Sequence, residues 1–409
     1  TTVILTFLHK GPTHMTLTKD QLLAMQDQYV LKTYSRDTIM TRGEGSYLWD
    51  IDGKRYLDFA MGISVCNLGH CHPAVTKAIC EQAAKLVHVS NLYQNENQPQ
   101  LAKIIAEASF GGKVFFANSG AEANEGLIKF ARKWGSRNGG RYEIICMNNS
   151  FHGRTLATLA ATGRSKYRDG FQPDVQGFVF ADFNDLDSIR AKIGPKTVAV
   201  LIEPVQGEGG IIPADKAFMT ALRQLCDEHQ LLLLLDEVQC GMGRTGKYFA
   251  YQHYGFVPDG MSMAKALGNG LPMGAFTVQQ KYHDVLPPGT HASTFGGTAL
   301  ACAAGIAVFQ TIAHEKLLDN VQAMSDYFFG ELRALQAKYP VIKTVRGIGL
   351  MVGADVGDKQ AAILAGCRDL GLLALPAGEG ILRMLPPLNV SKGQIDDACA
   401  ILDKVLARL

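Results

Sequence analysis

The sequence predicts an α/β protein with a mostly parallel sheet covered by helices on both faces, followed by a smaller C-terminal α+β unit. Short apolar runs that end in polar or glycine-rich turns alternate with longer helical patterns, as parallel strands joined by helices do. These runs are apolar at nearly every position, so both faces of the sheet must be covered. A chain of 409 residues also exceeds the size of one hydrophobic core, which predicts two or more subdomains.

The strands of the larger unit are expected in four runs: VFFANSG from residue 114, EIICMNNS from 143, TVAVLIEP from 197 and LLLLLDEV from 231. From about residue 318 the pattern changes to a helix over 320–339, strand-like segments over 349–352 and 380–384, and an amphipathic stretch from Ser391. We divide the chain into an N-terminal segment (1–69), a large unit (70–317) and a C-terminal unit (318–409). No linker rich in Pro, Gly and Ser separates them, so we expect them to pack together.

The charge balance indicates a small-molecule ligand. Lys and Arg number 40, Asp and Glu number 38, and the formal net charge is +2, which favours neither a nucleic acid nor an anionic membrane as partner. The longest aliphatic run in the middle of the chain, residues 231–235, is far shorter than the roughly 20 residues of a membrane span.

The cysteines and the N-terminus indicate a cytoplasmic protein. Nine cysteines are scattered with no CxxC pair and an odd total, so we expect reduced thiols. Residues 1–10 lack a basic segment and a small-residue cleavage site, and a signal peptide is therefore not expected.

A phosphate site is suggested where the first expected strand ends. Ser119 and Glu122 have the S-x-x-E spacing of a capping box, which opens a helix. A helix N-terminus offers free N–H groups to an anion, and Gly120 lets the backbone approach closely. Simple helix capping is the alternative for this feature taken alone, but ligands of α/β sheets bind at the carboxyl ends of strands.

Two further strand ends carry an acid and a lysine. Five leucines run directly into Asp236, where a carboxylate can pair with a protonated ring nitrogen, as a pyridoxal cofactor requires. Lys265 follows the apolar residues 261–264, and partial desolvation there would lower its pKa and make the amine a nucleophile toward an aldehyde. Alone, Asp236 could cap a helix and Lys265 could be solvated. Together, at neighbouring strand ends, they indicate one site.

Three more residues are candidates for ligand contacts at this site. Phe151 follows a third strand end and either packs in the core or stacks on a flat heterocycle. Arg154 and Arg383 offer planar guanidinium groups for carboxylates, with structural salt bridges as the alternative.

Two motifs point elsewhere and are weaker. GMGRTG at 241–246 matches the dinucleotide pattern GxGxxG and, with Lys247, part of a P-loop. However, residues 236–240 separate it from the strand end, and Tyr248 stands where a P-loop needs a Ser or Thr for magnesium. The second motif contains three common metal ligands, His70, Cys71 and His72. Adjacent residues rarely converge on one ion, so we expect no metal.

As a set, these residues resemble the class III aminotransferases of the pyridoxal-phosphate fold type I group, from about Thr38 to the C-terminus. The resemblance rests on NSGAEANE (118–125), FHGRTLATLAATG (151–163), IEPVQGEGG (202–210), LLDEVQCGMGRTGK (234–247), AKALGNGLPMGA (264–275) and HASTFGGTALA (291–301). Within the class, GSYLWDIDGKRYLDF, NLGHCHP, VSNLYQNENQ and STFGGT are most similar to the enzymes that act on acetylornithine in arginine biosynthesis. The resemblance implies that the N-terminal part joins the C-terminal unit in one small domain.

The resemblance also implies a pyridoxal 5′-phosphate site. Its residues would be Ser119, Gly120 and Ala121 at the phosphate, Phe151 and Val238 on the two ring faces, Asp236 at the ring nitrogen, Gln239 near the phenolic oxygen and Lys265 as the Schiff base. Thr294 would reach the phosphate of a partner subunit, so a homodimer with shared active sites is implied.

The substrate positions follow from the same resemblance. Arg154 and Ser293 would hold the acylated amino acid, Arg383 the α-carboxylate of glutamate or 2-oxoglutarate, and Glu208 would shield Arg383 while an ω-amine is bound. The implied reaction passes the amine of N2-acetyl-L-ornithine to 2-oxoglutarate by a ping-pong route, giving N-acetyl-L-glutamate 5-semialdehyde and L-glutamate.

Alternatives remain within and outside this chemistry. The chain departs from the family at residues 95–100, Thr298 and Ala299. Ornithine aminotransferases usually have a tyrosine near the position of Ile63, and its absence favours an N-acylated donor. Succinylornithine, ornithine, 4-aminobutyrate and the aminoadipate-semialdehyde branch are rival substrates. A nicotinamide oxidoreductase built on GMGRTG and a non-catalytic binding protein are the alternatives from other classes.

Overall fold

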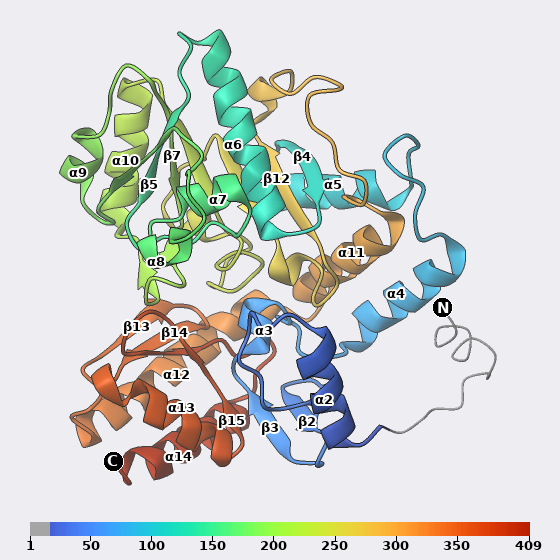
Figure 1. Cartoon of the computed structure of the whole chain (residues 1–409), viewed down its shortest axis with the longest axis vertical. Helices are drawn as coiled ribbons and strands as arrows, with labels where there is room; N and C mark the ends of the chain where they lie inside the picture. Colours follow the sequence, from blue (N-terminus) through green and yellow to red (C-terminus); the bar gives the residue numbers. More distant parts are fainter. Residues whose placement is uncertain (1–16) are drawn as a thin grey trace.

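The structure is a computed structural model that describes residues 17–409. The expectation about residues 1–10 lies outside this range. Figure 1 shows a large sheet with its helices in one half of the molecule, and N-terminal strands beside C-terminal elements in the other half. Within residues 17–409, every helix is too short or too polar to span a bilayer.

A seven-stranded sheet forms the large unit. Its strands are, in spatial order, β4 (Lys113–Ala117), β12 (Gly274–Val278), β11 (Gly260–Met263), β10 (Leu232–Asp236), β7 (Thr197–Ile202), β5 (Glu143–Met147) and β6 (Phe178–Ala181). Strands β11, β10, β7, β5 and β6 pair in parallel, whereas β12 runs antiparallel to both of its neighbours. The mostly parallel sheet and its four expected strands are therefore confirmed.

The leucines of β10 explain why the strand has no polar alternation. Leu232 and Leu234 pack in one hydrophobic cluster with residues of α6 (Gly120–Arg137). Leu233 and Leu235 belong to a second cluster that includes residues of α10 (Lys216–Glu228). Successive side chains of a strand point to opposite faces, so covering both faces requires an apolar residue at each position.

The remaining helices and short strands of the large unit surround this sheet. They are α4 (Pro73–Lys85), α5 (Asn97–Ala108), α7 (Leu156–Ala161), α8 (Ser165–Arg168), α9 (Leu186–Arg190), α11 (Ala299–His314), β8 (Val205–Gln206) and β9 (Ile212–Pro213). Short 3-10 turns occur at Ala250–His253, Lys265–Leu267 and Gln280–Tyr282, and a fourth, Gly357–Lys359, lies in the C-terminal part.

The smaller unit combines both ends of the described chain (Figure 1). Its C-terminal sheet has the order β13 (Thr344–Ile348), β14 (Met351–Asp355), β17 (Ile381–Met384) and β16 (Leu375–Pro376). Its other sheet joins β1 (Met40–Glu44), β2 (Tyr47–Asp50) and β3 (Arg55–Asp58) to β15 (Leu372–Leu373) from the C-terminal part. The helices are α2 (Lys19–Tyr29), α3 (Met61–Ser64), α12 (Leu317–Lys338), α13 (Gln360–Asp369) and α14 (Lys392–Leu406).

The pairing of β3 with β15 is the contact that makes one unit from two distant segments. It is parallel and aligns Leu57 with Leu372. The expected helix after residue 318, the two strand-like segments and the helix after Ser391 are all present, and Ser391 caps α14 with a capping box. The predicted fold class is confirmed, while boundaries at residues 69 and 317 stay a proposal.

Candidate active site

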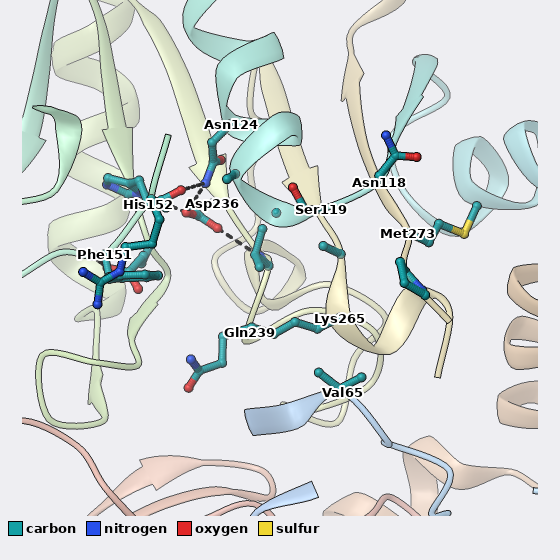
Figure 2. A pocket seen from close by; sticks show the side chains of 18 of the residues that line it. Val65, Asn118, Ser119, Asn124, Phe151, His152, Asp236, Gln239, Lys265 and Met273 are labelled. Carbon is teal, nitrogen blue, oxygen red and sulfur yellow. Dashed lines mark hydrogen bonds and ion pairs between the residues drawn. The ribbon is translucent and has the colours of Figure 1, made fainter. Parts of the chain in front are cut away.

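A cavity of about 370 Å³ opens where the carboxyl ends of the parallel strands meet. Its lining includes residues just beyond five strands: Ser119 after β4, Phe151 after β5, Glu203 after β7, Asp236 at the end of β10 and Lys265 after β11. Figure 2 shows several of these side chains around one space. The sheet topology therefore gathers residues that are far apart in the sequence, as expected for a ligand site in an α/β fold.

The N-terminus of α6 forms one wall. Ser119 is the N-cap, and its hydroxyl accepts a hydrogen bond from the backbone N–H of Glu122 at 3.2 Å. The expected capping box also requires the carboxylate of Glu122 to accept the backbone N–H of Ser119, and this hydrogen bond is not formed. The carboxylate accepts instead from the backbone N–H and the side-chain amide of Asn118, at 2.7 and 2.8 Å. Asn118 offers two donors one residue earlier, so this part of the expectation is wrong.

Glycines let the backbone come close at this wall. A Cβ on Gly120 would lie 2.6 Å from Cγ1 of Val238, and one on Gly274 would lie 2.3 Å from the carbonyl oxygen of Ser119. Both distances are shorter than real side-chain contacts, so any larger residue would displace the α6 N-terminus or the adjoining wall. The cradle of backbone N–H groups fits an anion such as a phosphate.

Asp236 is buried and firmly oriented. Its Oδ2 accepts hydrogen bonds from the side-chain amide of Asn124 at 2.7 Å and from Nδ1 of His152 at 2.8 Å, while Oδ1 accepts from the backbone N–H of Val238 at 3.0 Å. The hydroxyl of Ser262 donates to Oδ1 of Asn124 at 2.6 Å, which fixes the orientation of that amide. Figure 2 shows the dashed contacts between Asp236, Asn124 and His152. A carboxylate held this way can receive a further N–H group on Oδ1.

Lys265 lies in the cavity in a strained backbone conformation, with φ of +48°. Desolvation lowers the pKa of Lys265 to about 8, and the nearby charge of Arg383 acts in the same direction. Strands β10 and β11 are neighbours, so Asp236 and Lys265 come from adjacent strand ends as expected. An amine with this pKa is partly unprotonated near neutral pH and can act as a nucleophile or a base.

Glu203 is a further cavity residue that the sequence analysis does not single out. It is buried in the cavity wall, and its carboxylate accepts the backbone N–H groups of Phe151 at 3.1 Å and Gly207 at 3.4 Å. Desolvation and the charge of Asp236 raise the pKa of Glu203 well above its usual value. Glu203 thus fixes the backbone at Phe151. Its position directly after an apolar strand, like that of Asp236, was the available signal.

The aromatic and aliphatic side walls are Phe151 and Val238, which both line the cavity together with Ala121. Phe151 makes an edge-on contact with Tyr167, with ring centroids 5.8 Å apart. The guanidinium of Arg154 lies over Tyr167 at 4.1 Å from the ring centroid. Arg154 also lines the cavity and is exposed, so its charge faces the opening.

Arg383 and Glu208 form an ion pair next to the cavity. Nη1 of Arg383 donates to Oε1 of Glu208 at 2.6 Å and to Oε1 of Gln239 at 3.2 Å. The Arg383 side chain is 3% exposed, and that of Glu208 is 21% exposed. Gln239 lines the cavity and turns its side-chain oxygen to Arg383. The pair is therefore a buried cation covered by a more accessible carboxylate.

Ser293 and Thr294 lie outside this cavity in the single chain. They line a second hollow of about 840 Å³ that Ser90, Phe115 and neighbouring segments also border. Ser293 remains close to the first site, because Nδ2 of Asn118 lies 3.3 Å from its hydroxyl. Thr294 is exposed.

The two competing motifs have other structural roles. GMGRTG forms a turn that does not open a helix, unlike a dinucleotide-binding loop. Nε2 of His70 lies 2.8 Å from Asp58, and Nε2 of His72 lies 3.3 Å from Glu315. Within residues 17–409, no group of three or more potential metal ligands comes together.

Comparisons with known proteins give one consistent result. The family model described as aminotransferase class-III matches residues 31–406. The chain is 49% identical over 392 residues to acetylornithine aminotransferase of Caldanaerobacter subterraneus subsp. tengcongensis, covering 95% of this chain and 100% of that protein. It is 43% identical over 390 residues to succinylornithine transaminase/acetylornithine aminotransferase of Pseudomonas aeruginosa, covering 94% and 96%.

Solved structures are similar over the same length. N-acetylornithine aminotransferase from Stenotrophomonas maltophilia K279a has a TM-score of 0.82 and 35% identity, with 94% of this chain and 98% of that chain covered. Ornithine aminotransferase from Toxoplasma gondii, described with partial occupancy of PLP at its active site, has a TM-score of 0.91 and 32% identity, with 96% and 95% covered.

Proposed function

This chain belongs to the class III aminotransferase family, and we propose that it transfers the side-chain amine of N2-acetyl-L-ornithine to 2-oxoglutarate. The products are N-acetyl-L-glutamate 5-semialdehyde and L-glutamate. One observation supports this proposal most directly: the cavity that holds Lys265 and the oriented Asp236 adjoins an arginine covered by a carboxylate, Arg383 with Glu208. Lys265 and Asp236 suit chemistry on an amine, and the pair of Arg383 and Glu208 suits the binding of two unlike substrates in turn.

Pyridoxal 5′-phosphate is the cofactor of this reaction, and the cavity residues fit it. The α6 N-terminus with Ser119 and Gly120 would hold the phosphate, and Asp236 would pair with the ring nitrogen. Phe151 and Val238 would face the two sides of the ring. When bound, the cofactor supplies an electron sink for the carbon that loses a proton.

Lys265 is the base and nucleophile of the proposed mechanism. Its amine lies in the cavity, and its pKa of about 8 leaves part of it unprotonated near neutral pH. Nζ of Lys265 would remove the proton from the amine-bearing carbon of the donor and later return a proton to the acceptor. Asp236 is oriented by the donors Asn124 and His152, and Glu203 positions Phe151.

Glu208 and Arg383 would let one cavity accept both substrates. With the ion pair closed, the cation is neutralised and the ω-amine end of the donor can enter. When Glu208 moves away, Arg383 is free to bind the α-carboxylate of 2-oxoglutarate or glutamate as a planar fork. The two half-reactions then follow each other at one site, which is a ping-pong mechanism.

Arg154 and Ser293 would bind the far end of the acylated donor. Arg154 lies exposed at the cavity, with its guanidinium beside Tyr167. Ile63 is 39% exposed and has no hydroxyl for a free α-amino group, which favours an N-acylated donor over ornithine. Succinylornithine is the second candidate, because the Pseudomonas aeruginosa relative carries both names.

The proposal includes a homodimer with shared sites. Leu92, Tyr93 and Phe295 are 87%, 73% and 61% exposed, which is unusual for large apolar side chains in a lone chain. Leu92 borders the hollow that Thr294 lines, and Phe295 follows Thr294 directly. A second copy that covers this surface would bring Thr294 toward the neighbouring phosphate site.

A cytoplasmic location completes the proposal. All nine cysteines lie within the described residues and are free thiols, several of them buried. Such usage suits a reducing compartment, where structural disulfides are rare.

Half-reaction spectroscopy tests the proposed function. The purified protein, loaded with pyridoxal phosphate, is titrated separately with N-acetylornithine, N-succinylornithine and ornithine, without any keto acid. We expect the visible cofactor band to decay with acetylornithine at a concentration about ten-fold or more below that needed for ornithine. Equal decay with ornithine would contradict the preference for an acylated donor, while the aminotransferase assignment would stand. No visible band after adding pyridoxal phosphate would refute the aminotransferase itself.

A further inference from the structure

The segment before Val65 has an unusual backbone. Met61, Gly62, Ile63 and Ser64 in α3 have φ of +45°, +60°, +65° and +63°, so four consecutive residues are left-handed and only one is glycine. Residues with a Cβ adopt this conformation only where their surroundings impose it. We call residues 61–64 the left-handed turn. Its shape must be held by contacts from outside.

The left-handed turn leads directly into the active-site cavity. Val65 follows it and lines the cavity, and its backbone N–H bonds to the carbonyl of Met61 at 2.8 Å. Figure 2 shows Val65 on this N-terminal segment, on the side of the cavity away from Ser119. Gly62 and Ile63 are exposed beside it. The position of Val65 is therefore set by the turn.

Asp58 holds the start of the turn. Its Oδ1 accepts the backbone N–H groups of Ala60 at 2.7 Å and Met61 at 3.1 Å. Its Oδ2 lies 2.8 Å from Nε2 of His70, so the carboxylate is fixed as well.

Arg244 holds the end of the turn. Its Nε donates to the hydroxyl of Ser64 at 3.0 Å, and its Nη2 donates to the side-chain oxygen of Asn67. The same hydroxyl lies 3.3 Å from the backbone carbonyl oxygen of Gln239, a residue of the cavity. Arg244 also donates to the carbonyls of Leu350 and Pro386, so it links three segments of the fold.

Arg244 differs from an ordinary buried structural arginine. It is completely buried, and within residues 17–409 it forms no ion pair. Desolvation lowers the pKa of Arg244 to about 9, so the group still carries its charge at neutral pH. Arg223, by contrast, pairs with Asp259 at 2.7 Å. A buried charge that has only neutral partners is costly, and in some proteins such a group specifies a conformation.

We propose that Arg244 is a positioning residue for the amino donor, which it serves by holding the left-handed turn through Ser64 and Asn67 and so fixing the cavity wall at Val65. This inference rests on the proposed function. It assigns a role to GMGRTG, which binds no nucleotide in this scheme. The acylated donor is longer than 2-oxoglutarate and would contact more of the cavity wall, so a displaced wall should impair the donor more than the acceptor.

The experiment compares Arg244→Lys and Ser64→Ala with the control Arg223→Lys, all as cofactor-loaded protein. We expect KM for N-acetylornithine to rise about ten-fold in both test variants, while kcat and KM for 2-oxoglutarate change less than about two-fold. The visible cofactor spectrum should stay as in the wild type. Arg223→Lys should lower Tm without changing the donor KM, because its ion pair lies away from the cavity.

Ser64→Ala removes one hydroxyl and keeps the rest of the Arg244 contacts, so it tests the inference even if Arg244→Lys does not fold. An unchanged donor KM in folded Ser64→Ala would overturn the positioning role. A parallel loss of kcat, cofactor spectrum and Tm would also overturn it, since that pattern denotes a general structural role. If the wild type itself does not turn over acetylornithine, the proposed function fails instead.

Discussion

Oε1 of Glu208 accepts a hydrogen bond from Nη1 of Arg383 at 2.6 Å, and this contact neutralises the cation that a keto acid would need. The carboxylate is the more accessible partner, with 21% of its side chain exposed against 3% for the arginine. Glu208 is therefore the partner expected to move when the pair opens, because the Arg383 side chain is buried on strand β17. This relationship predicts how the two half-reactions respond to mutation.

Glu208→Ala should separate the two half-reactions. Arg383 would be left uncovered, so KM for 2-oxoglutarate is expected to fall several-fold, while the half-reaction with N-acetylornithine slows by about ten-fold or more. Stopped-flow measurement of each half-reaction tests this expectation. Glu208→Gln is the matched control, since it keeps the shape of the side chain but not its charge. Equal effects of Glu208→Ala on both halves would contradict the gating role.

Lys265→Ala should abolish turnover while preserving the fold. Loss of the amine removes both the nucleophile and the base, so we expect kcat to fall by roughly 10³-fold or more. Pyridoxal phosphate should still bind through the other cavity residues, but it should be removable by dialysis. Lys281→Ala is a suitable control, because Lys281 is exposed and outside the cavity. Retention of normal turnover in Lys265→Ala would refute the mechanism.

The donors around Asp236 should tune the cofactor site. Asn124→Leu removes the amide that bonds Oδ2 of Asp236 and leaves the hydroxyl of Ser262 without its acceptor. A buried charge-assisted hydrogen bond contributes about 1.5–3 kcal/mol, so we expect kcat to fall about ten- to hundred-fold. Ser262→Ala, which leaves the bond to Asp236 intact, should have a smaller effect. The reverse order of the two effects, measured as kcat and cofactor Kd, would contradict this network.

How far the sequence could predict this site depends on the kind of contact involved. Lys265 and Asp236 stand directly after apolar runs, and the parallel sheet brings such strand ends together whatever the details of packing. The direction of β12 was not predictable, because its apolar run looks like those of its parallel neighbours. The same limit applies to Asn124, since a helix residue gave no sign that its amide would reach Asp236 from another element.

The left-handed turn shows a second limit. Residues 61–64 contain one glycine, and nothing in their local sequence indicates four positive φ angles. Their conformation follows from Asp58 and Arg244, which come from different parts of the chain. For the same reason, the local pattern GMGRTG resembles a dinucleotide loop and does not indicate that the partners of Arg244 lie in three other segments. Tertiary contacts decide such cases.

The pKa of Lys265 predicts how cofactor capture depends on pH. Desolvation and the charge of Arg383 lower this pKa to about 8, and only the unprotonated amine can attack the aldehyde of pyridoxal phosphate. The rate of cofactor capture by cofactor-free protein should therefore rise with pH, with its midpoint near the Lys265 pKa of about 8, and level off at higher pH. Arg383→Gln removes a nearby positive charge, so the midpoint should move to higher pH. Stopped-flow absorbance tests both points, and a midpoint that moves downward would contradict the assignment.

Subunit complementation tests whether Thr294 serves the site of a partner. Lys265→Ala and Thr294→Arg should each be inactive alone, because each destroys both sites of its own homodimer. In a heterodimer, one site carries both defects and the other carries neither, provided that Thr294 acts across the interface. Random pairing makes half of the dimers mixed, each with one intact site, so coexpression should restore about a quarter of wild-type activity. If Thr294 instead completed the site of its own chain, every site would keep one defect and coexpression would restore nothing. The second hollow, which Thr294 lines apart from the Lys265 cavity, favours the first outcome.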